Sequence, residues 1–194
     1  MENRSSVTRK IVITAVLIAI TIVLSIPLNL GPFISLGFIA IPPMIAVTIL
    51  VVPTIIGAVL EGPIVGFIVG AAFGLFSLFL AAQQPAGSAN AIFVDPIISV
   101  VPRLFIGPVA WLVYTAMKSM REQWRLVGAA VAGTLTNTIL VIGAIALRLG
   151  VPFFVTLLSV GINVVLELIV ASVIVVAVVS ALRGRASGAG CSSV

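Results

Sequence analysis

The sequence contains few side chains that could perform chemistry, and their types exclude several classes of enzyme. It has no histidine, one cysteine (Cys191), one aspartate (Asp95) and four glutamates. A Ser/His intramembrane protease, a histidine-ligated metal site and a paired-aspartate protease each need groups that this chain lacks. The inventory therefore favours a protein that is not an enzyme, and it predicts neither a metal site nor a cofactor.

Arg103 is the charged residue best placed to bind a ligand. It follows Pro96 by seven residues in an apolar run, which puts it about 10 Å into a membrane at about 1.5 Å per residue. Placing an arginine at the bilayer centre costs about 2.5 to 3.5 kcal/mol of insertion free energy, so we expect another group to stabilise the arginine. Either Arg103 snorkels, pairs with Asp95 or bonds free carbonyls near Pro102, or it binds an anionic ligand in a cavity open to the outside.

A second group of polar residues recurs at helical spacing in the last third of the chain. Spacings of three and four residues place one set on a single helical face. That set is Thr156, Ser159, Asn163 and Glu167. The preceding apolar run adds Thr134 and Asn137 near mid-membrane. Such residues either line a polar cavity or form hydrogen bonds between helices, as membrane bundles commonly do.

The composition indicates that these residues lie in a protein of the lipid bilayer. Hydrophobic residues make up 61% of the 194 residues, charged residues only 8%, and the mean hydropathy is +1.38. In soluble domains about a quarter of the residues are charged, so the composition excludes a soluble globular domain. Disordered chains have low hydrophobicity, so it also excludes disorder. At about 20 apolar residues per spanning helix, the chain holds roughly six spans. The predicted fold class is an all-α membrane protein of six transmembrane helices.

Six apolar runs can be separated by their breaks. They cover residues 11–28, 42–60, 64–82, 95–117, 126–149 and 151–182. Glu61-Gly62-Pro63 forms one turn, and Asp95-Pro96 opens the fourth run as a helix cap followed by a first-turn proline. Residues 1–182 are predicted to form a single transmembrane domain. Residues 183–194 are predicted to form a short cytoplasmic tail.

The basic residues predict the orientation of the six spans. Eight of them fall on the side that holds both termini, and only Arg148 falls on the other side. The eight are Arg4, Arg9, Lys10, Lys118, Arg121, Arg125, Arg183 and Arg185. Because positive loops stay in the cytoplasm, both termini are predicted to be cytoplasmic. This bias also accounts for most of the net charge of +5, so no nucleic-acid partner is expected.

Two stripes of small residues occur in the first half of the chain. Ala15 and Ala19 are four residues apart, and so are Gly66, Gly70 and Gly74. Small residues at this spacing let helices approach closely. Such a stripe serves either packing within the chain or docking of another membrane subunit.

Two segments resemble a known family. Residues 62–70, GPIVGFIVG, and residues 93–107, FVDPIISVVPRLFIG, are similar to the substrate-binding S components of energy-coupling factor (ECF) vitamin transporters. The resemblance implies a multi-pass protein of the prokaryotic plasma membrane that docks on a transmembrane coupling (T) subunit driven by two cytoplasmic ATPases. It also implies that helices four to six and the connections 29–41 and 83–94 enclose a vitamin.

The resemblance further implies roles for particular residues. It implies that Ala15 and Ala19 are docking contacts and that Arg103, Asn137 and Asn163 are ligand contacts. The residue pattern adds Gly66, Gly70 and Gly74 to the docking contacts, and Ser159, Thr134 and Asp95 to the ligand contacts. The pattern looks most like members for pantothenate or a hydroxymethyl pyrimidine, and the carboxylate of pantothenate suits Arg103. Riboflavin, folate and cobalamin remain alternatives. A stand-alone ion-coupled carrier using Glu167, and a structural membrane protein, remain open as well.

Overall fold

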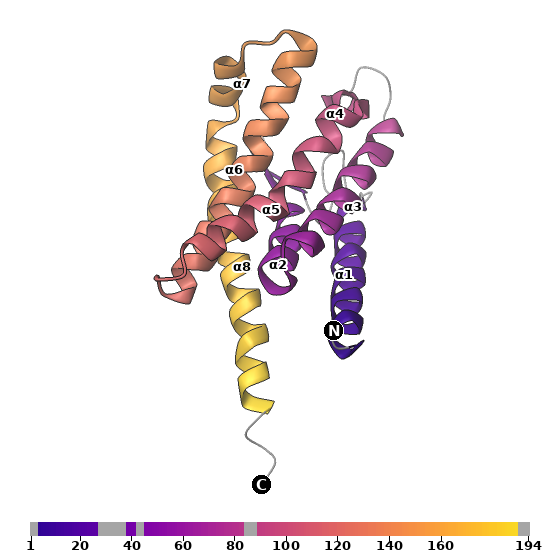
Figure 1. Ribbon diagram of the computed structural model, residues 1–194. Coiled ribbons are helices and arrows are strands. Elements are labelled where there is room, and N and C mark those ends of the chain that lie inside the picture. Colours follow the sequence, from indigo (N-terminus) through magenta and orange to yellow (C-terminus); the bar gives the residue numbers. More distant parts are fainter. Residues whose placement is uncertain (1–3, 27–37, 42–44, 84–88, 190–194) are drawn as a thin grey trace.

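The computed structural model describes all of the chain except residues 1–3, 27–37, 42–44, 84–88 and 190–194, and it is predominantly helical (Figure 1). The elements in chain order are α1 (Arg4–Ser25), β1 (Phe38–Ile41), β2 (Ile45–Thr48), α2 (Val51–Glu61), α3 (Pro63–Ala82), the 3-10 helix η1 (Ala89–Val94), α4 (Pro96–Ser99), α5 (Val101–Ala116), α6 (Glu122–Leu149), α7 (Phe153–Ser159) and α8 (Gly161–Ala189).

Five helical segments in the described part of the chain are long and apolar enough to cross a membrane. They are Val7–Ser25, Pro63–Ala82, Pro96–Ala116, Glu122–Leu149 and Gly161–Gly184. The predicted class of helical membrane protein is therefore confirmed. α2 is apolar too, but its 11 residues extend only about 16 Å, too short to span a bilayer alone.

The second predicted span, residues 42–60, is wrong in its first half. Residues Phe38–Ile41 and Ile45–Thr48 pair as an antiparallel hairpin in which Ile41 lies opposite Ile45. The helix begins only at Val51. The segment Ile45–Thr48 is rich in β-branched residues, which favour strands over helices. High apolarity alone did not distinguish a strand from a helix in this segment.

The glycine stripe of α3 packs inside the chain. A Cβ on Gly66 would lie 2.9 Å from the Cα of Gly107 in α5, and one on Gly74 would lie 2.8 Å from the Cα of Val100. Gly70 meets the backbone of Arg103 in the same way. These three glycines are buried against α4 and α5, so the expectation that they contact a separate subunit is corrected. Their small size permits close approach of helices within this protein.

The fourth predicted span begins as expected but contains a break. The Asp95 carboxylate accepts a hydrogen bond of 2.9 Å from the N–H of Ile97 and so caps α4. α4 ends at Ser99, and α5 resumes at Val101. Pro102 lacks an N–H donor, which removes one helical hydrogen bond at this junction.

The sixth predicted span, residues 151–182, is two helices rather than one. α7 and α8 are separated at Val160. Gly161 is a poor helix former and favours a break here. α8 continues beyond residue 182 to Ala189, so part of the expected tail has a helical backbone. α6 ends as predicted, at Gly150, whose φ of 68° suits glycine.

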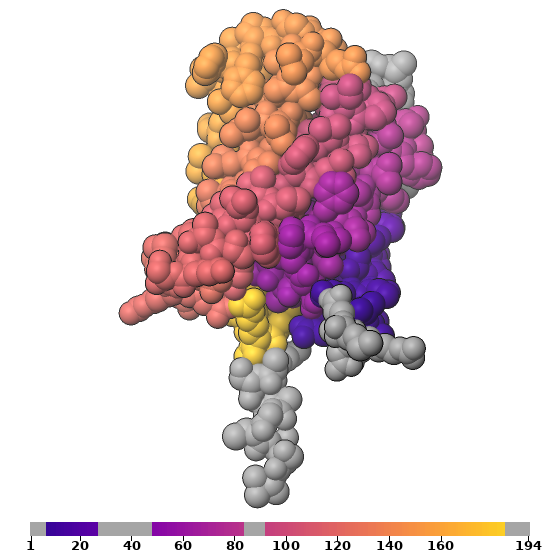
Figure 2. Space-filling view, viewed as in Figure 1, coloured from indigo at the N-terminus to yellow at the C-terminus, as the bar shows by residue number. Residues whose placement is uncertain are grey.

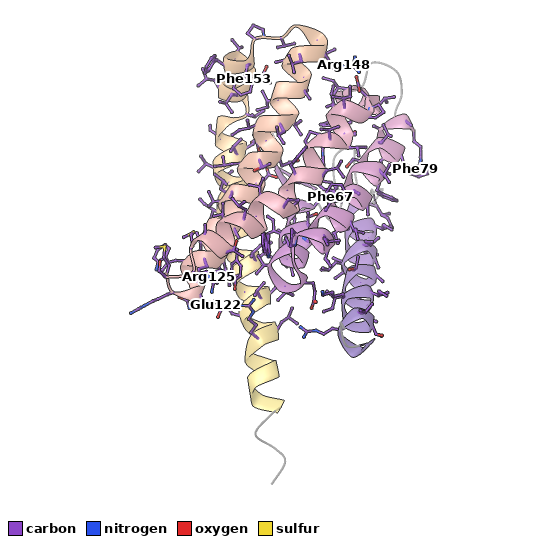
Figure 3. All side chains as sticks on the ribbon, in the orientation of Figure 1. Phe67, Phe79, Glu122, Arg125, Arg148 and Phe153 are labelled. Carbon is purple, nitrogen blue, oxygen red and sulfur yellow. The ribbon has the colours of Figure 1, made fainter. Side chains whose placement is uncertain are left out.

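The start of α1 and the last turns of α8 lie at the same end of the bundle, together with the turn between α5 and α6 (Figure 1). We call this the terminal end. Figure 2 shows the yellow part of α8 emerging from the packed body there. Arg148 lies at the opposite end, away from Glu122 and Arg125 (Figure 3).

The core lies where α2 meets α3, α5 and α6. Ile55 of α2 is fully buried with Val69, Ile106 and Leu126. In a bilayer such packing stabilises mainly through van der Waals contact, since lipid is as apolar as the side chains. The buried α2 therefore lies at the centre of the bundle, and the longer helices pack around it.

Polar contacts join α5, α6 and α8 at the terminal end. Nη1 of Arg183 donates a hydrogen bond of 2.8 Å to the hydroxyl of Tyr114, and Arg183 also forms an ion pair with Glu122. Nε of Arg125 donates to the carbonyl of Tyr114 at 3.2 Å, and its guanidinium lies 4.1 Å from the Tyr114 ring centroid. Tyr114 thus links three helices through two arginines.

Candidate ligand-binding site

Five polar side chains from four helices are buried inside the bundle. They are Thr54 of α2 (0% exposed), Arg103 of α5 (6%), Thr134 (0%) and Asn137 (9%) of α6, and Glu167 of α8 (8%). We call these five residues the polar core. Buried polar groups are costly unless they are paired, so their partners indicate what the site requires.

Arg103 is held by backbone and by aromatic rings. Its Nη1 donates a hydrogen bond to the carbonyl of Ile98. That carbonyl would bond the N–H of residue 102 in a continuous helix, but Pro102 has none. The guanidinium carbon lies 5.5 Å from the ring centroid of Phe73 and 5.1 Å from that of Phe93. The proline break therefore creates the acceptor that orients the arginine toward two aromatic rings.

One polar atom on each member of the polar core has no hydrogen-bond partner among the described residues. These atoms are Thr54 Oγ1, Arg103 Nε, Thr134 Oγ1, Asn137 Oδ1 and Glu167 Oε1. Most buried polar atoms in proteins are paired, so several unpaired ones in one region need an explanation. The set combines a cationic hydrogen-bond donor, two oxygen acceptors, and two hydroxyls that can donate or accept a hydrogen bond.

Helix register brings the members of the polar core to neighbouring levels. A Cβ on Gly133 of α6 would lie 3.4 Å from the Cβ of Ala110 in α5. Because α5 and α6 form an antiparallel hairpin (Figure 1), counting from this contact places Asn137 level with Ile106, one turn from Arg103. The opposite charges of Arg103 and Glu167 lie within electrostatic range of each other. Thr54 lies near the Arg103 backbone, since both border Gly70.

Asp95 does not pair with Arg103. Its Oδ2 lies 3.0 Å from Nε of Arg148, and its other oxygen caps α4. This pair joins the start of α4 to the end of α6, away from the polar core. Of the alternatives considered for Arg103, the structure shows the bond to a carbonyl near Pro102 and not the ion pair with Asp95.

Ser159 and Asn163 are not among the buried residues of the polar core. Ser159 is exposed on α7 and donates a hydrogen bond of 2.8 Å to the carbonyl of Val155, one turn earlier in its own helix. Asn163 is half-buried and already interacts with another group. The break at Val160 separates Ser159 from the face of α8 that carries Glu167, whereas Asn163 lies on α8 one turn before Glu167. Of the six predicted ligand contacts, Arg103, Thr134 and Asn137 are buried inside the bundle.

Sequence reasoning missed Thr54 as a member of this site. It is the only polar residue between Val51 and Leu60, which is a usable signal in an apolar run. Glu167 was noticed as a coupling group for an ion rather than as a neighbour of Arg103. The two rings beside Arg103 could not be found from spacing, because Phe73 and Phe93 come from different elements.

Ala15 and Ala19 are exposed on α1. The buried side of α1 carries Leu17 and Thr21 instead. The alanine pair therefore lies on a face of α1 that the rest of the described chain leaves uncovered. Such a face is available to a membrane-embedded neighbour, in contrast to the internal glycine stripe of α3.

Comparisons with known proteins agree with this architecture. A family model described as "ECF transporter, substrate-specific component" matches residues 9–181. A solved S-component for biotin from an ECF-type ABC transporter is similar in fold, with a TM-score of 0.64, 17% sequence identity and coverage of 95% of both chains. A comparison with curated proteins gives no match. The family model covers most of the chain, and the chain therefore belongs to the substrate-specific components of ECF transporters.

Proposed function

We propose that this protein is the membrane-embedded vitamin-binding subunit of an ATP-driven ECF importer and that its ligand is a small anionic vitamin, with pantothenate the first candidate. The observation that carries the proposal is the polar core, in which a buried arginine and four other buried side chains each have a polar atom without a hydrogen-bond partner among the described residues. A bound ligand that supplies those partners would remove the cost of burying them.

The chemistry of pantothenate matches these atoms in kind. Its carboxylate can accept a hydrogen bond from Nε of Arg103, and arginine binds carboxylates with particularly good geometry. Its amide N–H and two hydroxyls can donate to the side-chain oxygens of Asn137 and Glu167. Thr54 and Thr134 can donate or accept, so they suit the ligand's hydroxyls and carbonyl.

Biotin is the second candidate. The similar fold of the biotin S-component favours it, and biotin also has one carboxylate with N–H donors at the other end of the molecule. Hydroxymethyl pyrimidine, riboflavin and cobalamin have no carboxylate and folate has two, so they fit less well a proposal that rests on one carboxylate reaching a single buried arginine. Of the connections expected to enclose the ligand, residues 29–37 and 84–88 lie outside the described part of the chain.

The transport role requires partners. We propose that the exposed Ala15 and Ala19 face of α1 contacts the T subunit of a module driven by two cytoplasmic ATPases. In this arrangement the terminal end is cytoplasmic, with residues 1–182 as the membrane domain and 183–194 as its tail, in the plasma membrane of a prokaryote. The strong bias of basic residues toward that end supports the orientation.

Two measurements test the proposal. Mass spectrometry of small molecules released from the purified protein should detect pantothenate or biotin, and calorimetry with both vitamins should rank them. Uptake by cells should require ATP and a co-expressed coupling subunit. Ion-driven uptake by this chain alone would instead establish a stand-alone carrier, and a neutral or cationic ligand would remove the role proposed for Arg103.

A further inference from the structure

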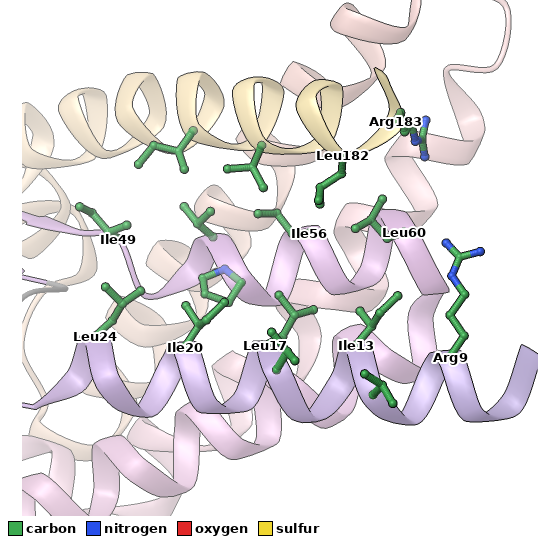
Figure 4. A pocket seen from close by; sticks show the side chains of 16 residues that line it. Arg9, Ile13, Leu17, Ile20, Leu24, Ile49, Ile56, Leu60, Leu182 and Arg183 are labelled. Atoms are coloured by element: carbon green, nitrogen blue, oxygen red, sulfur yellow. The ribbon is translucent and has the colours of Figure 1, made fainter. Parts of the chain in front are cut away.

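A long apolar groove is lined by none of the polar-core residues. It has a volume of about 710 Å³ and is bordered by α1, α2 and α8. Aliphatic side chains and Pro53 line almost all of it, including Val16 and Ile20 of α1, Ile56 of α2 and Val178 of α8. Figure 4 shows these helices along the groove, with Leu24 and Ile49 near one end and two arginines at the other.

The arginines at the terminal end are Arg9 and Arg183, the two charged residues that line the groove. Nη2 of Arg9 lies 3.2 Å from Oε1 of Glu61, but the Arg9 side chain is 69% exposed. A guanidinium has five N–H donors, so one ion pair leaves Arg9 able to bind a further anion. Arg183 is engaged with Glu122 and Tyr114 and contributes a second positive charge.

The surroundings of this end are basic as a whole. Among the side chains described there, six are basic and two are acidic: Arg9, Lys10, Lys118, Arg121, Arg125 and Arg183 against Glu61 and Glu122. Basic pockets between transmembrane helices are sites at which anionic lipid head groups bind. The potential at this end of the groove therefore complements a phosphate-bearing head group.

The groove also matches the tail of such a molecule. From Arg9 to Leu24 it follows α1 for about 22 Å, more than the depth of about 15 Å of one hydrocarbon leaflet. Its two side walls, α1 and α8, are membrane-length helices with exposed apolar residues such as Val12 and Leu182. Hydrocarbon, rather than water, can reach the groove from the side.

We infer that this groove is a binding site for one anionic phospholipid, with an acyl chain along α1, α2 and α8 and the head group at Arg9 and Arg183. A groove that is apolar along its length and basic at one end fits an amphiphile with one charged head. The inference is independent of the proposed vitamin site, because none of the polar-core residues lines the groove.

The test uses the purified full-length chain in detergent, titrated with phosphatidylglycerol or with phosphatidylcholine of identical acyl chains and followed by native mass spectrometry. Phosphatidylglycerol should bind at least tenfold more tightly. Arg9→Gln should reduce that preference below threefold, whereas Lys118→Gln, at an exposed position that does not line the groove, should preserve it.

A matched pair of substitutions tests the acyl-chain position. Ile20 lines the groove and Ile22 does not, although both lie on α1 and are 43% and 37% exposed. Ile20→Trp should fill the groove and weaken binding of both lipids at least tenfold, while Ile22→Trp should change it less than twofold. Val12→Trp, at the arginine end of the groove, replaces Ile20→Trp if that variant does not fold. Thermal unfolding verifies the fold of each variant.

Three results would overturn the inference. Equal affinity for the two lipids would remove the head-group site, and unchanged binding in well-folded Ile20→Trp and Val12→Trp proteins would place the lipid elsewhere. Binding of neither lipid, together with cross-linking of a cysteine at Val178 to a coupling subunit in the assembled transporter, would identify a protein helix as the occupant.

Discussion

Asp95 and Arg148 form a 3.0 Å ion pair that joins the start of α4 to the end of α6, and Asp95 therefore does not neutralise Arg103. Both side chains are partly exposed, so the pair contributes about 0 to 1 kcal/mol. Asp95→Asn keeps the helix cap and removes the charge. We expect vitamin affinity to change less than twofold and the melting temperature to fall only slightly, as measured by calorimetry and thermal unfolding. A large loss of affinity would place Asp95 in the ligand site.

Arg103 should be essential for binding an anionic vitamin. Arg103→Ala removes the charge that the carboxylate needs, and breaking a buried charge pair costs about 3 to 5 kcal/mol. Arg103→Lys should restore only part of the affinity, because an ammonium lacks the planar fork of a guanidinium. Calorimetry with pantothenate and biotin measures both effects.

Arg148→Ala is the matched control for Arg103→Ala, since it removes a partly exposed arginine that pairs with Asp95 and is not a member of the polar core. It should bind as tightly as the unmodified protein. If Arg103→Ala folds well and binds with unchanged affinity, then Arg103 has a structural role through the Ile98 carbonyl, and the case for an anionic ligand fails.

The contact between Gly66 and Gly107 should tolerate no side chain. A Cβ on Gly107 would lie within 2.6 Å of the Gly66 Cα, and both partners are backbone atoms that cannot move aside. We expect Gly107→Ala to destabilise the protein by about 1 to 3 kcal/mol, the usual range for overpacking. Gly143→Ala, with nothing within 4 Å, should be neutral or stabilising by up to about 1 kcal/mol. Thermal unfolding compares the two, and equal melting temperatures would contradict the packing.

The exposed alanine pair of α1 should be needed for transport and not for binding. Ala15→Trp combined with Ala19→Trp should abolish ATP-driven uptake, because large side chains prevent close approach of a partner helix. Calorimetry on the isolated variant should give unchanged vitamin affinity. Val173→Trp, on an exposed face of α8, serves as the control and should transport normally. Continued uptake by the double variant would show that the docking face does not include Ala15 and Ala19.

The two ends of the bundle should be accessible from opposite sides of the membrane. In a Cys191→Ser background, a cysteine at Met120 in the α5–α6 turn should react only with reagents that reach the cytoplasm. A cysteine at Val151 should react from outside. Both positions are exposed. Reaction of both from one side would contradict the proposed orientation.

Local chemistry made part of this fold predictable. The predicted run 64–82 matches α3 within one residue, because Gly62-Pro63 ends one helix and starts the next. The Asp95 cap was predicted correctly for the same reason, since it involves only the neighbouring residue Ile97. The β1–β2 hairpin was missed because strands and helices that are both apolar look alike in composition.

The site was harder to predict from the sequence, because it depends on which helices pack against each other. Nothing in the spacing of Gly66 and Gly70 indicates whether they face α5 or another subunit, and that choice decides their role. Arg103 was identified from its cost in a membrane, and a carbonyl near Pro102 was one of its predicted partners. Its aromatic neighbours and the nearby Thr54 depend on how four helices meet, which one sequence does not show.

The links around Tyr114 have a mechanical consequence for the proposed ligand site. Because Arg125 and Arg183 fasten α5, α6 and α8 to one another at one end, these helices resist sliding independently. The same three helices carry Arg103, Asn137 and Glu167. We therefore expect these three residues to keep their mutual spacing if the protein tilts in the bilayer, so that release of the proposed ligand does not require the three helices to separate.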